Sequence, residues 1–374
     1  MSIRIIEADE AKALSPHAKW KLLSPFLTRH GGQALSYATL QSGMEYFITD
    51  HGFIAYHTVQ HRVFSPRPKR IGFTDPVCAA ADYPRLLDEF LARGKRASFA
   101  CVSEEFARAL RERRFKVNCI GYEVELPVQT YNTAGNWKEL DLIKRARNEA
   151  KREGLMIREM PIEQVSRAQL EEVSRRWIGG KKVNDREIWL YARKAIFEPE
   201  EGVRKFIAFD REGHVAGFAF YDPIYATGRV TGYSANVLRC DEKRFGRLAT
   251  AIHMEAIERF KSEGVEILNL NLAPFAKLES GNFNDDFGAK IFFKLSEKFG
   301  NDIYNFRGLA FHKSKYRGAE KFLYFASNSL WPSNDIYLAF KSADITQSYL
   351  STLGRLVLGM VTAKKKGKAD TNGH

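Results

Sequence analysis

Cysteine is scarce in this 374-residue chain, and its placement excludes several kinds of site. The four cysteines lie far apart, at Cys78, Cys101, Cys119 and Cys240. None has the C-x-x-C spacing of a zinc or redox site, and four over this length cannot form a dense disulfide framework. His57 and His61 have the spacing of helical metal ligands but lie in a strand-like segment. We therefore predict no metal and a reducing, cytoplasmic environment.

Long apolar runs are also absent. No segment reaches the about 18 consecutive apolar residues that a membrane-spanning helix needs, and the charged N-terminal residues lack the apolar core of a secretory leader. The nearest approach is residues 347–368, where Leu350, Leu353, Val357 and Met360 recur at helical spacing before a lysine cluster. One interpretation is peripheral contact with the inner face of the membrane. The alternative is a terminal helix packed on the protein and followed by a disordered tail.

Acidic residues are in deficit, because 45 Asp and Glu face 58 Lys and Arg. The resulting net charge of +13 and the isoelectric point near 9.4 favour anionic partners such as nucleic acid or acidic lipid. The 44% hydrophobic content still provides ample material for the cores of two domains of ordinary size.

The first part of the chain has an α/β pattern. Aromatic and β-branched residues at 44–50 and 53–60 flank a His-Gly pair and predict a hairpin. A helix over 81–94, a strand over 97–103, a second helix capped by Ser103 and a strand over 115–126 are predicted to follow. This order indicates helices packed on a mixed sheet.

The second part of the chain has a similar mixture of predicted helices and strands. Helices are predicted over 162–180 and 185–197, a three-stranded meander over 203–238, a long helix over 243–264 and an apolar strand over 265–273. The order of meander, long helix and apolar strand resembles that of acyltransferases of the GNAT type, so we expect two tandem GNAT-like domains. The predicted units are an N-terminal domain (1–135), a basic linking helix (136–158), a C-terminal catalytic domain (159–345) and an amphipathic segment with a basic tail (346–374).

The linking helix concentrates positive charge on one face. Leu142, Ile143, Ala146 and Ala150 fall on one arc at 100° per residue, and the opposite arc carries cations. These cations are the predicted tRNA-binding residues Lys144, Arg145, Arg147, Lys151 and Arg152. Contact with phosphates and an ordinary solvated face are both compatible with this pattern.

Several segments resemble the catalytic domain of the lysylphosphatidylglycerol synthases, also called multiple peptide resistance factors. "LNLNLAPF" at 268–275 is similar to the family's "FNLGMAPL", and "YNFRGLAFHKSKY" at 304–316 is similar to "YNFQGLRAYKEKF". "IKRARNEAKREGL" at 143–155 and "TDPVC" at 74–78 are similar to "LRRALNRAEREGL" and "GDPVG". The resemblance spans about residues 30–330. It implies tandem GNAT-like folds that transfer an amino acid from aminoacyl-tRNA to a hydroxyl of a lipid such as phosphatidylglycerol, with no separate cofactor.

The matched segments contain most of the candidate site residues, and His253 of the long helix is added because an imidazole can act as a general base. The predicted catalytic residues are Arg239, Lys313, His253 and Tyr304. The predicted substrate-binding residues are Asn269, Asn271, Asn236, Arg307, Lys315 and Tyr316. A lone histidine inside a helix is more often a packed core residue. The tyrosines are also compatible with core packing, and the lysines with surface charge. "YSANVLR" at 233–239 resembles the family's "SVDLMR", so Asn236 replaces an acid, which leaves the transferred amino acid open.

Two other functions remain open at this stage. An acyl-CoA N-acyltransferase would bind pyrophosphate at the start of the long helix. "KRFGRLA" at 243–249 keeps Gly246 but has Leu248 where the backbone should approach phosphate. A non-catalytic basic module that binds nucleic acid or membrane is the other alternative.

Overall fold

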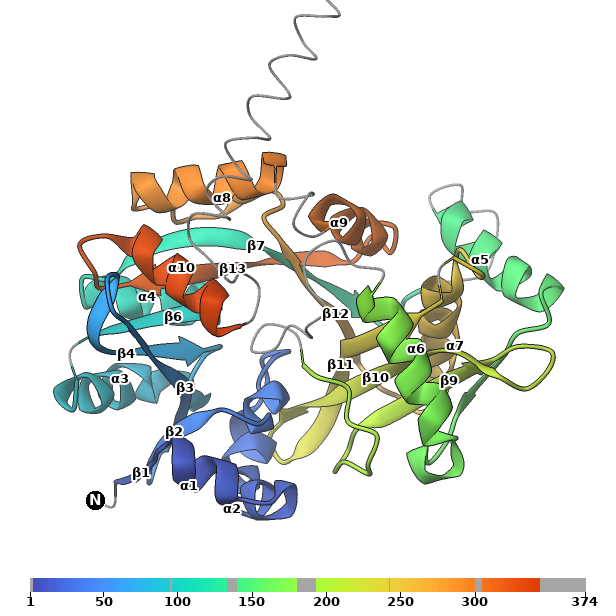
Figure 1. The fold of residues 1–374 in the computed structure, drawn as a ribbon, viewed down its shortest axis with the longest axis horizontal. Helices are drawn as coiled ribbons and strands as arrows, with labels where there is room; N and C mark the ends of the chain where they lie inside the picture. The colour runs from blue at the N-terminus through green and yellow to red at the C-terminus, as the bar shows by residue number, and fades with distance from the viewer. Residues whose placement is uncertain are drawn as a thin grey trace, which may run out of the picture.

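The computed structural model describes residues 3–94, 96–132, 140–179, 193–241, 243–299 and 305–343, which form one mixed sheet with helices on both faces (Figure 1). The strand order is β1-β2-β3-β4-β6-β13-β7-β12-β11-β10-β9-β8, with β5 paired to β3. The predicted α/β class with mixed sheets is thus confirmed. None of the described helices combines the length and apolar content needed to cross a bilayer.

The secondary structure elements have the following bounds. The strands are β1 (Arg4–Ile6), β2 (Glu45–Thr49), β3 (Gly52–His61), β4 (Ser65–Phe73), β5 (Val77–Cys78), β6 (Ala97–Val102), β7 (Lys116–Pro127), β8 (Met156–Glu159), β9 (Arg204–Phe209), β10 (Val215–Ala226), β11 (Arg229–Cys240), β12 (Ile267–Pro274) and β13 (Ala319–Ser327). The α-helices are α1 (Ala8–Ala13), α2 (Pro16–His30), α3 (Tyr83–Ala92), α4 (Glu104–Glu112), α5 (Asp141–Arg152), α6 (Arg167–Gly179), α7 (Leu248–Ser262), α8 (Phe287–Phe299), α9 (Phe306–Ser314) and α10 (Pro332–Ser342).

The first half of the sheet follows the local sequence signals. β2 and β3 form the predicted antiparallel hairpin, with Ile48 opposite Phe53. The Ser103 side chain accepts a hydrogen bond from the Phe106 amide and caps α4 as predicted. Apolar side chains of these strands and of α3 and α4 form the first core, which includes Phe90 and Phe99.

The C-terminal part of the chain returns to this first core. β13 lies between β6 and β7, with Tyr324 opposite Val102 on one side and Phe322 opposite Tyr122 on the other. Most of the buried apolar residues between Phe275 and Ala343 belong to the same core as the first 120 residues. The unit boundaries remain predictions, but residues 275–343, assigned above to the C-terminal unit, supply side chains to the N-terminal core.

The second half contains the predicted meander of β9, β10 and β11, and then α7 and β12. α7 begins at Leu248, five residues after the predicted start, and its chain turns at Gly264 with φ of +77°. A second core of α5, α7 and this part of the sheet is centred on Phe206 and Phe260. Most of the predicted helix over 185–197 lies outside the described residues.

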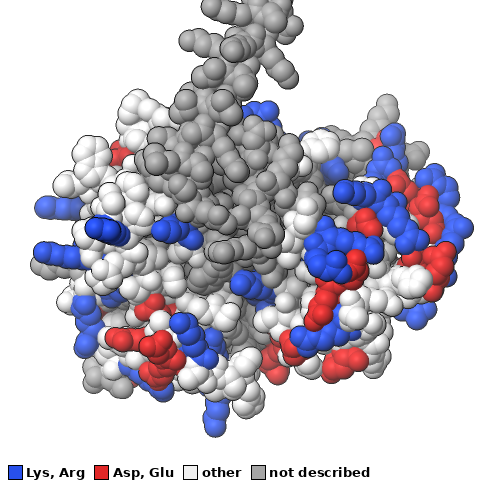
Figure 2. Space-filling view, in the orientation of Figure 1, with Lys and Arg blue, Asp and Glu red and all other residues white. Residues whose placement is uncertain are grey.

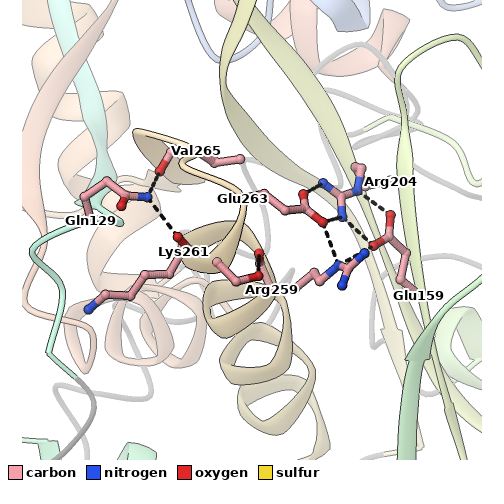
Figure 3. Close-up of polar contacts among 8 residues, drawn as sticks. Gln129, Glu159, Arg204, Arg259, Lys261, Glu263 and Val265 are labelled. Atoms are coloured by element: carbon pink, nitrogen blue, oxygen red, sulfur yellow. Dashed lines mark hydrogen bonds and ion pairs between the residues drawn. The ribbon is translucent and has the colours of Figure 1, made fainter.

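Ion pairs fix the C-terminal end of α7 against β8 and β9 (Figure 3). Arg204 pairs with Glu159 through two nitrogens and with Glu263 at 2.5 Å, and Arg259 joins Glu263 at 2.6 Å. On the other side, the Gln129 amide donates to the Val265 carbonyl at 2.7 Å. These contacts hold α7 in place beside the central strands.

The central strand β12 is interrupted at Asn271, which has φ of +67°. Its pairing with β7 shifts register between Asn269 and Leu272. Its parallel pairing with β11 extends only to Ser234 opposite Asn269. Backbone amides and carbonyls between Asn269 and Leu272 therefore lack regular hydrogen bonds to the neighbouring strands. Buried backbone groups without such bonds need other partners.

The ion pairs at the end of α7 generate a stability prediction. Arg204→Ala leaves the half-buried carboxylates of Glu159 and Glu263 without their shared cation, so we expect the free energy of unfolding to fall by about 2 kcal/mol or more. Urea denaturation measures the change. Arg167→Ala, which removes an exposed cation that also pairs with two carboxylates, Glu171 and Glu198, serves as the control and should lower the free energy of unfolding much less. Equal losses in both variants would contradict the anchoring role.

The backbone at Asn271 generates a second stability prediction. Asn271→Ala and Asn271→Gly both remove the amide hydrogen bonds, but alanine also carries the left-handed strain that glycine avoids. We expect the alanine variant to unfold more easily than the glycine variant by about 1 kcal/mol. Thermal and urea denaturation of the two proteins test this order, and the reverse order would rule out a strained backbone.

Candidate functional site

The interruption of β12 brings together the three asparagines predicted to bind substrate. Asn269 Oδ1 accepts a hydrogen bond from the Asn271 backbone amide at 2.7 Å, and Asn271 Nδ2 donates to Asn236 Oδ1. Asn236 is the extra residue of a β-bulge in β11, because Phe220 pairs with Val237 and Tyr221 with Ala235. The bulge gives the Asn236 amide access to β12 and β10 at once.

A buried charged network extends from Asn236. Its Nδ2 donates to Asp222 Oδ2 at 2.7 Å, and Asp222 Oδ1 lies 2.8 Å from Nη2 of Arg193. Arg193 also pairs with Glu200, which in turn lies 3.0 Å from Lys205 Nζ. Burial raises the pKa of the Asp222 carboxyl to about 6, whereas Arg193 opposes this rise. The carboxylate nearest to Asn236 is therefore already engaged by a cation.

Lys313 approaches the same break in β12 from α9. The Asn305 side chain caps this helix by accepting from the Gly308 amide at 2.9 Å, and Lys313 follows two turns later on the inner face. Its Nζ donates to the Leu272 carbonyl at 2.5 Å, and only 6% of the residue is exposed. Burial lowers the pKa of this amine to about 7, so a large fraction is neutral at physiological pH.

Glu123 is the acidic counterpart of Lys313. It lies on β7 directly opposite Leu272, whose carbonyl accepts the Lys313 hydrogen bond. Burial raises the pKa of the Glu123 carboxyl to about 7, while Lys321 and a hydrogen bond from Asn269 act in the opposite direction. Its Oε2 has no hydrogen-bond partner among the described residues. A buried acid and a buried base that both titrate near neutrality are typical of sites that move protons.

His253 lies on α7 and is buried. Its Nδ1 is 2.7 Å from the hydroxyl of Tyr221, and its ring centroid is 5.8 Å from those of His312 and Tyr316. Burial first, and then His312 and Lys313, keep the pKa of His253 well below its ordinary value. The backbone carbonyl of Tyr316 accepts a hydrogen bond from the Tyr131 hydroxyl at 2.9 Å. His253 is thus a neutral, hydrogen-bonded residue next to the helix that carries Lys313.

Three other predicted site residues have local contacts of their own. The Arg239 guanidinium stacks 3.6 Å from the centroid of Trp177, on the face of the sheet that α6 covers. Arg307 is exposed and donates to the Lys298 carbonyl at 2.9 Å. Lys315 is half-buried, with Nζ 5.1 Å from the Phe311 ring. Tyr304 lies outside the described residues.

The cations of α5 point away from the core, because Ile143, Ala146 and Ala150 are buried beneath the helix. Several have acidic neighbours, such as Arg145 with Asp141 and Arg147 with Glu258, both at 3.9 Å. Figure 2 shows blue and red side chains mixed over this part of the surface. Contact between α5 and tRNA therefore stays a prediction.

One cluster among the described residues has the spacing of a cation site, formed by Asp210, Glu212 and His214 in the β9–β10 turn. Asp210 already accepts from the backbone amides of the other two residues, and its second oxygen lies 2.9 Å from Arg244 Nη1. These contacts are those of an ordinary turn with an ion pair.

Sequence reasoning missed Glu123 and Asp222, the two buried acids of the site. Each is an acidic residue inside an otherwise apolar strand segment, "GYEVEL" and "FYDPIY" respectively. Because acidic residues are rarely fully buried without a function or a partner, this position was an available signal.

Comparison with known proteins gives a consistent picture. L-PGS from Bacillus licheniformis has a similar fold, with a TM-score of 0.67 and 20% identity over 85% of this chain and 96% of that one. The C-terminal domain of a putative lysylphosphatidylglycerol synthetase from Agrobacterium fabrum has a TM-score of 0.68 and 18% identity over 87% and 97%. At these identities the likeness shows the fold.

A curated Corynebacterium glutamicum protein, described as uncharacterized, is 23% identical over 301 residues. The match covers 78% of this chain but only 36% of that relative's length. Residues 24–327 match the family model described as phosphatidylglycerol lysyltransferase, C-terminal. This match extends over most of the chain and includes both halves of the sheet and the break in β12, so the chain belongs to the phosphatidylglycerol lysyltransferase C-terminal family.

Proposed function

We propose that the protein transfers an amino acid from aminoacyl-tRNA to a hydroxyl group of phosphatidylglycerol or a related anionic lipid. The observation that carries this proposal is the buried Lys313 amine beside the break in β12, within a chain of this family. Aminoacyl esters are already activated, so the protein needs to position two substrates and to accept a proton.

In the proposed reaction, Lys313 accepts the proton of the attacking hydroxyl. The lipid oxygen forms a bond to the ester carbonyl carbon, and the bond from that carbon to the ribose oxygen of the tRNA breaks. The ribose oxygen leaves with a proton, which the protonated Lys313 can return. A neutral amine at physiological pH suits both steps, because it gains and loses a proton near the working pH.

Glu123 supports this role by its position. Glu123 is paired across the sheet with Leu272, whose carbonyl accepts the hydrogen bond from Lys313. The charge of Glu123 raises the pKa of the Lys313 amine, whereas burial lowers it. The asparagines of β11 and β12 are proposed to orient the aminoacyl end. Asn236 replaces an acid of the resembling family, and the nearby Asp222 is paired with Arg193. We therefore propose no preference for a lysyl group.

The partners follow from the same proposal. Lys144, Arg145, Arg147, Lys151 and Arg152 of α5 would contact tRNA phosphates. Residues 347–368 lie outside the described residues, and their membrane contact remains a prediction from sequence. The site of action would be the inner face of the cytoplasmic membrane, where both substrates meet.

Direct assay of donor and acceptor tests the proposal. The full chain is incubated with a complete set of labelled aminoacyl-tRNAs and vesicles of total lipid, and the product is identified by mass. We expect label in an aminoacylated anionic lipid. Label transfer from acyl-CoA alone, or tRNA binding without any turnover, would contradict the proposed reaction.

The pH dependence of transfer tests the role of Lys313. Below pH about 7 the amine becomes protonated and can no longer accept a proton, so we expect kcat/KM to fall about tenfold per pH unit and to level off above about 7. Lys313→Met should lower kcat by about 10²-fold or more while keeping the apolar volume. Lys341→Met on α10 is the surface control. A fully active Lys313→Met protein would remove Lys313 from the reaction.

A further inference from the structure

Three large apolar side chains are exposed beside one another at the starts of α8 and α10. Phe287 is 75% exposed, Leu330 84% and Trp331 71%. Lys116 connects the two segments, because its Nζ lies 2.9 Å from Asp286 Oδ2 and 3.3 Å from the Leu330 carbonyl. Ile291, one helical turn after Phe287, is 41% exposed. We call Phe287, Ile291, Leu330 and Trp331 the apolar cap.

The segment that presents Leu330 and Trp331 is held rigidly. Lys69, whose side chain is fully buried, donates to Ser329 Oγ at 2.5 Å and pairs with Asp335 on the first turn of α10. Ser327 also donates to Asp335, so both ends of the segment are attached to one buried ion pair. Pro332 follows Trp331 as the first residue of the helix. The backbone on both sides of Leu330 and Trp331 is therefore anchored by buried contacts, while their side chains are exposed.

The inner face of α8 is packed like an ordinary core helix. Phe292 and Phe293 contact Phe340 of α10 and Phe275, with centroid distances of 5.7 and 5.8 Å. The outward stripe begins with Phe287 and Ile291 and continues with Lys294 and Lys298. α8 thus shows an apolar end and a cationic end on its solvent face.

Lysines lie next to the apolar cap and outnumber the acids with which they pair. Lys116, Lys290 and Lys294 share two carboxylates, those of Asp286 and Glu279, so a net positive charge remains. Where grey atoms do not cover the upper left of Figure 2, the surface is largely white with a few blue and red side chains. Exposed Trp, Leu and Phe beside lysines suit a headgroup layer, where apolar groups enter the acyl boundary and cations meet anionic lipid.

We propose that the apolar cap docks the protein on the surface of an anionic lipid bilayer. This surface is distinct from residues 347–368 and does not depend on the transfer reaction. Contiguous exposed apolar groups of this size mark interaction sites, and the neighbouring lysines select a negatively charged partner.

Vesicle co-sedimentation of the full chain, without any tRNA, tests the proposal. The vesicles contain phosphatidylcholine with about 30% phosphatidylglycerol, enough for a clear negative surface potential. Leu330→Gln combined with Trp331→Gln should lower the bound fraction at least about tenfold, because two side chains no longer leave water. Because both side chains are exposed, the two substitutions should leave the melting temperature unchanged. Met156→Gln on β8, the last strand at the other edge of the sheet, is the matched control with 44% exposure.

Unchanged vesicle binding by the double variant, or an equal loss in Met156→Gln, would overturn the proposal. A change in sedimentation coefficient without lipid, with vesicle binding retained, would instead show a contact between two copies of the chain and also overturn it. An independent measurement uses lipids brominated in the acyl chain. Trp331→Phe should still bind vesicles but lose part of the tryptophan quenching, and undiminished quenching would place Trp331 outside the bilayer.

Discussion

The loss of backbone pairing at Asn271 is the constraint on which the site depends. A central strand normally uses all its amides and carbonyls in the ladder, but β12 parts from β11 and shifts register on β7 at this point. The Leu272 carbonyl becomes the acceptor for Lys313, and the Asn271 side chain reaches Asn236. Because buried polar groups must find partners, the broken ladder engages side chains from two other elements, α9 and β11.

Those recruited groups give the interior an unusual electrostatic character. Glu123 and Lys313 are each buried enough for their neutral forms to be populated near pH 7, whereas Asp222, Arg193, Glu200 and Lys205 form a closed set of ion pairs. Burying such charges costs desolvation that ion pairing only partly offsets. These groups lie near the interrupted part of β12, where the proposed proton transfer and substrate orientation would use them.

Much of the fold was accessible from sequence because its signals are local. The hairpin of β2 and β3, the Ser103 cap and the meander of β9 to β11 follow from alternation, turn residues and helix capping. Lys313 and Asn269 could be singled out by resemblance, whereas Asn271 stands where the resembling segment has glycine. Glu123 could not be paired with Lys313, because they lie far apart in sequence and meet only when α9 covers β12 next to β7.

By itself, the sequence determined the α/β class, the order of most elements and the family, since periodicity and short motifs are properties of neighbouring residues. The tertiary structure alone decided that β13 inserts between β6 and β7, that Arg239 faces α6, and that Asp222 is already paired. Alternation along a strand fixes which face a side chain occupies. Which partner it meets there depends on sheet order and on bulges such as the one at Asn236, and these arise from contacts between distant parts of the chain.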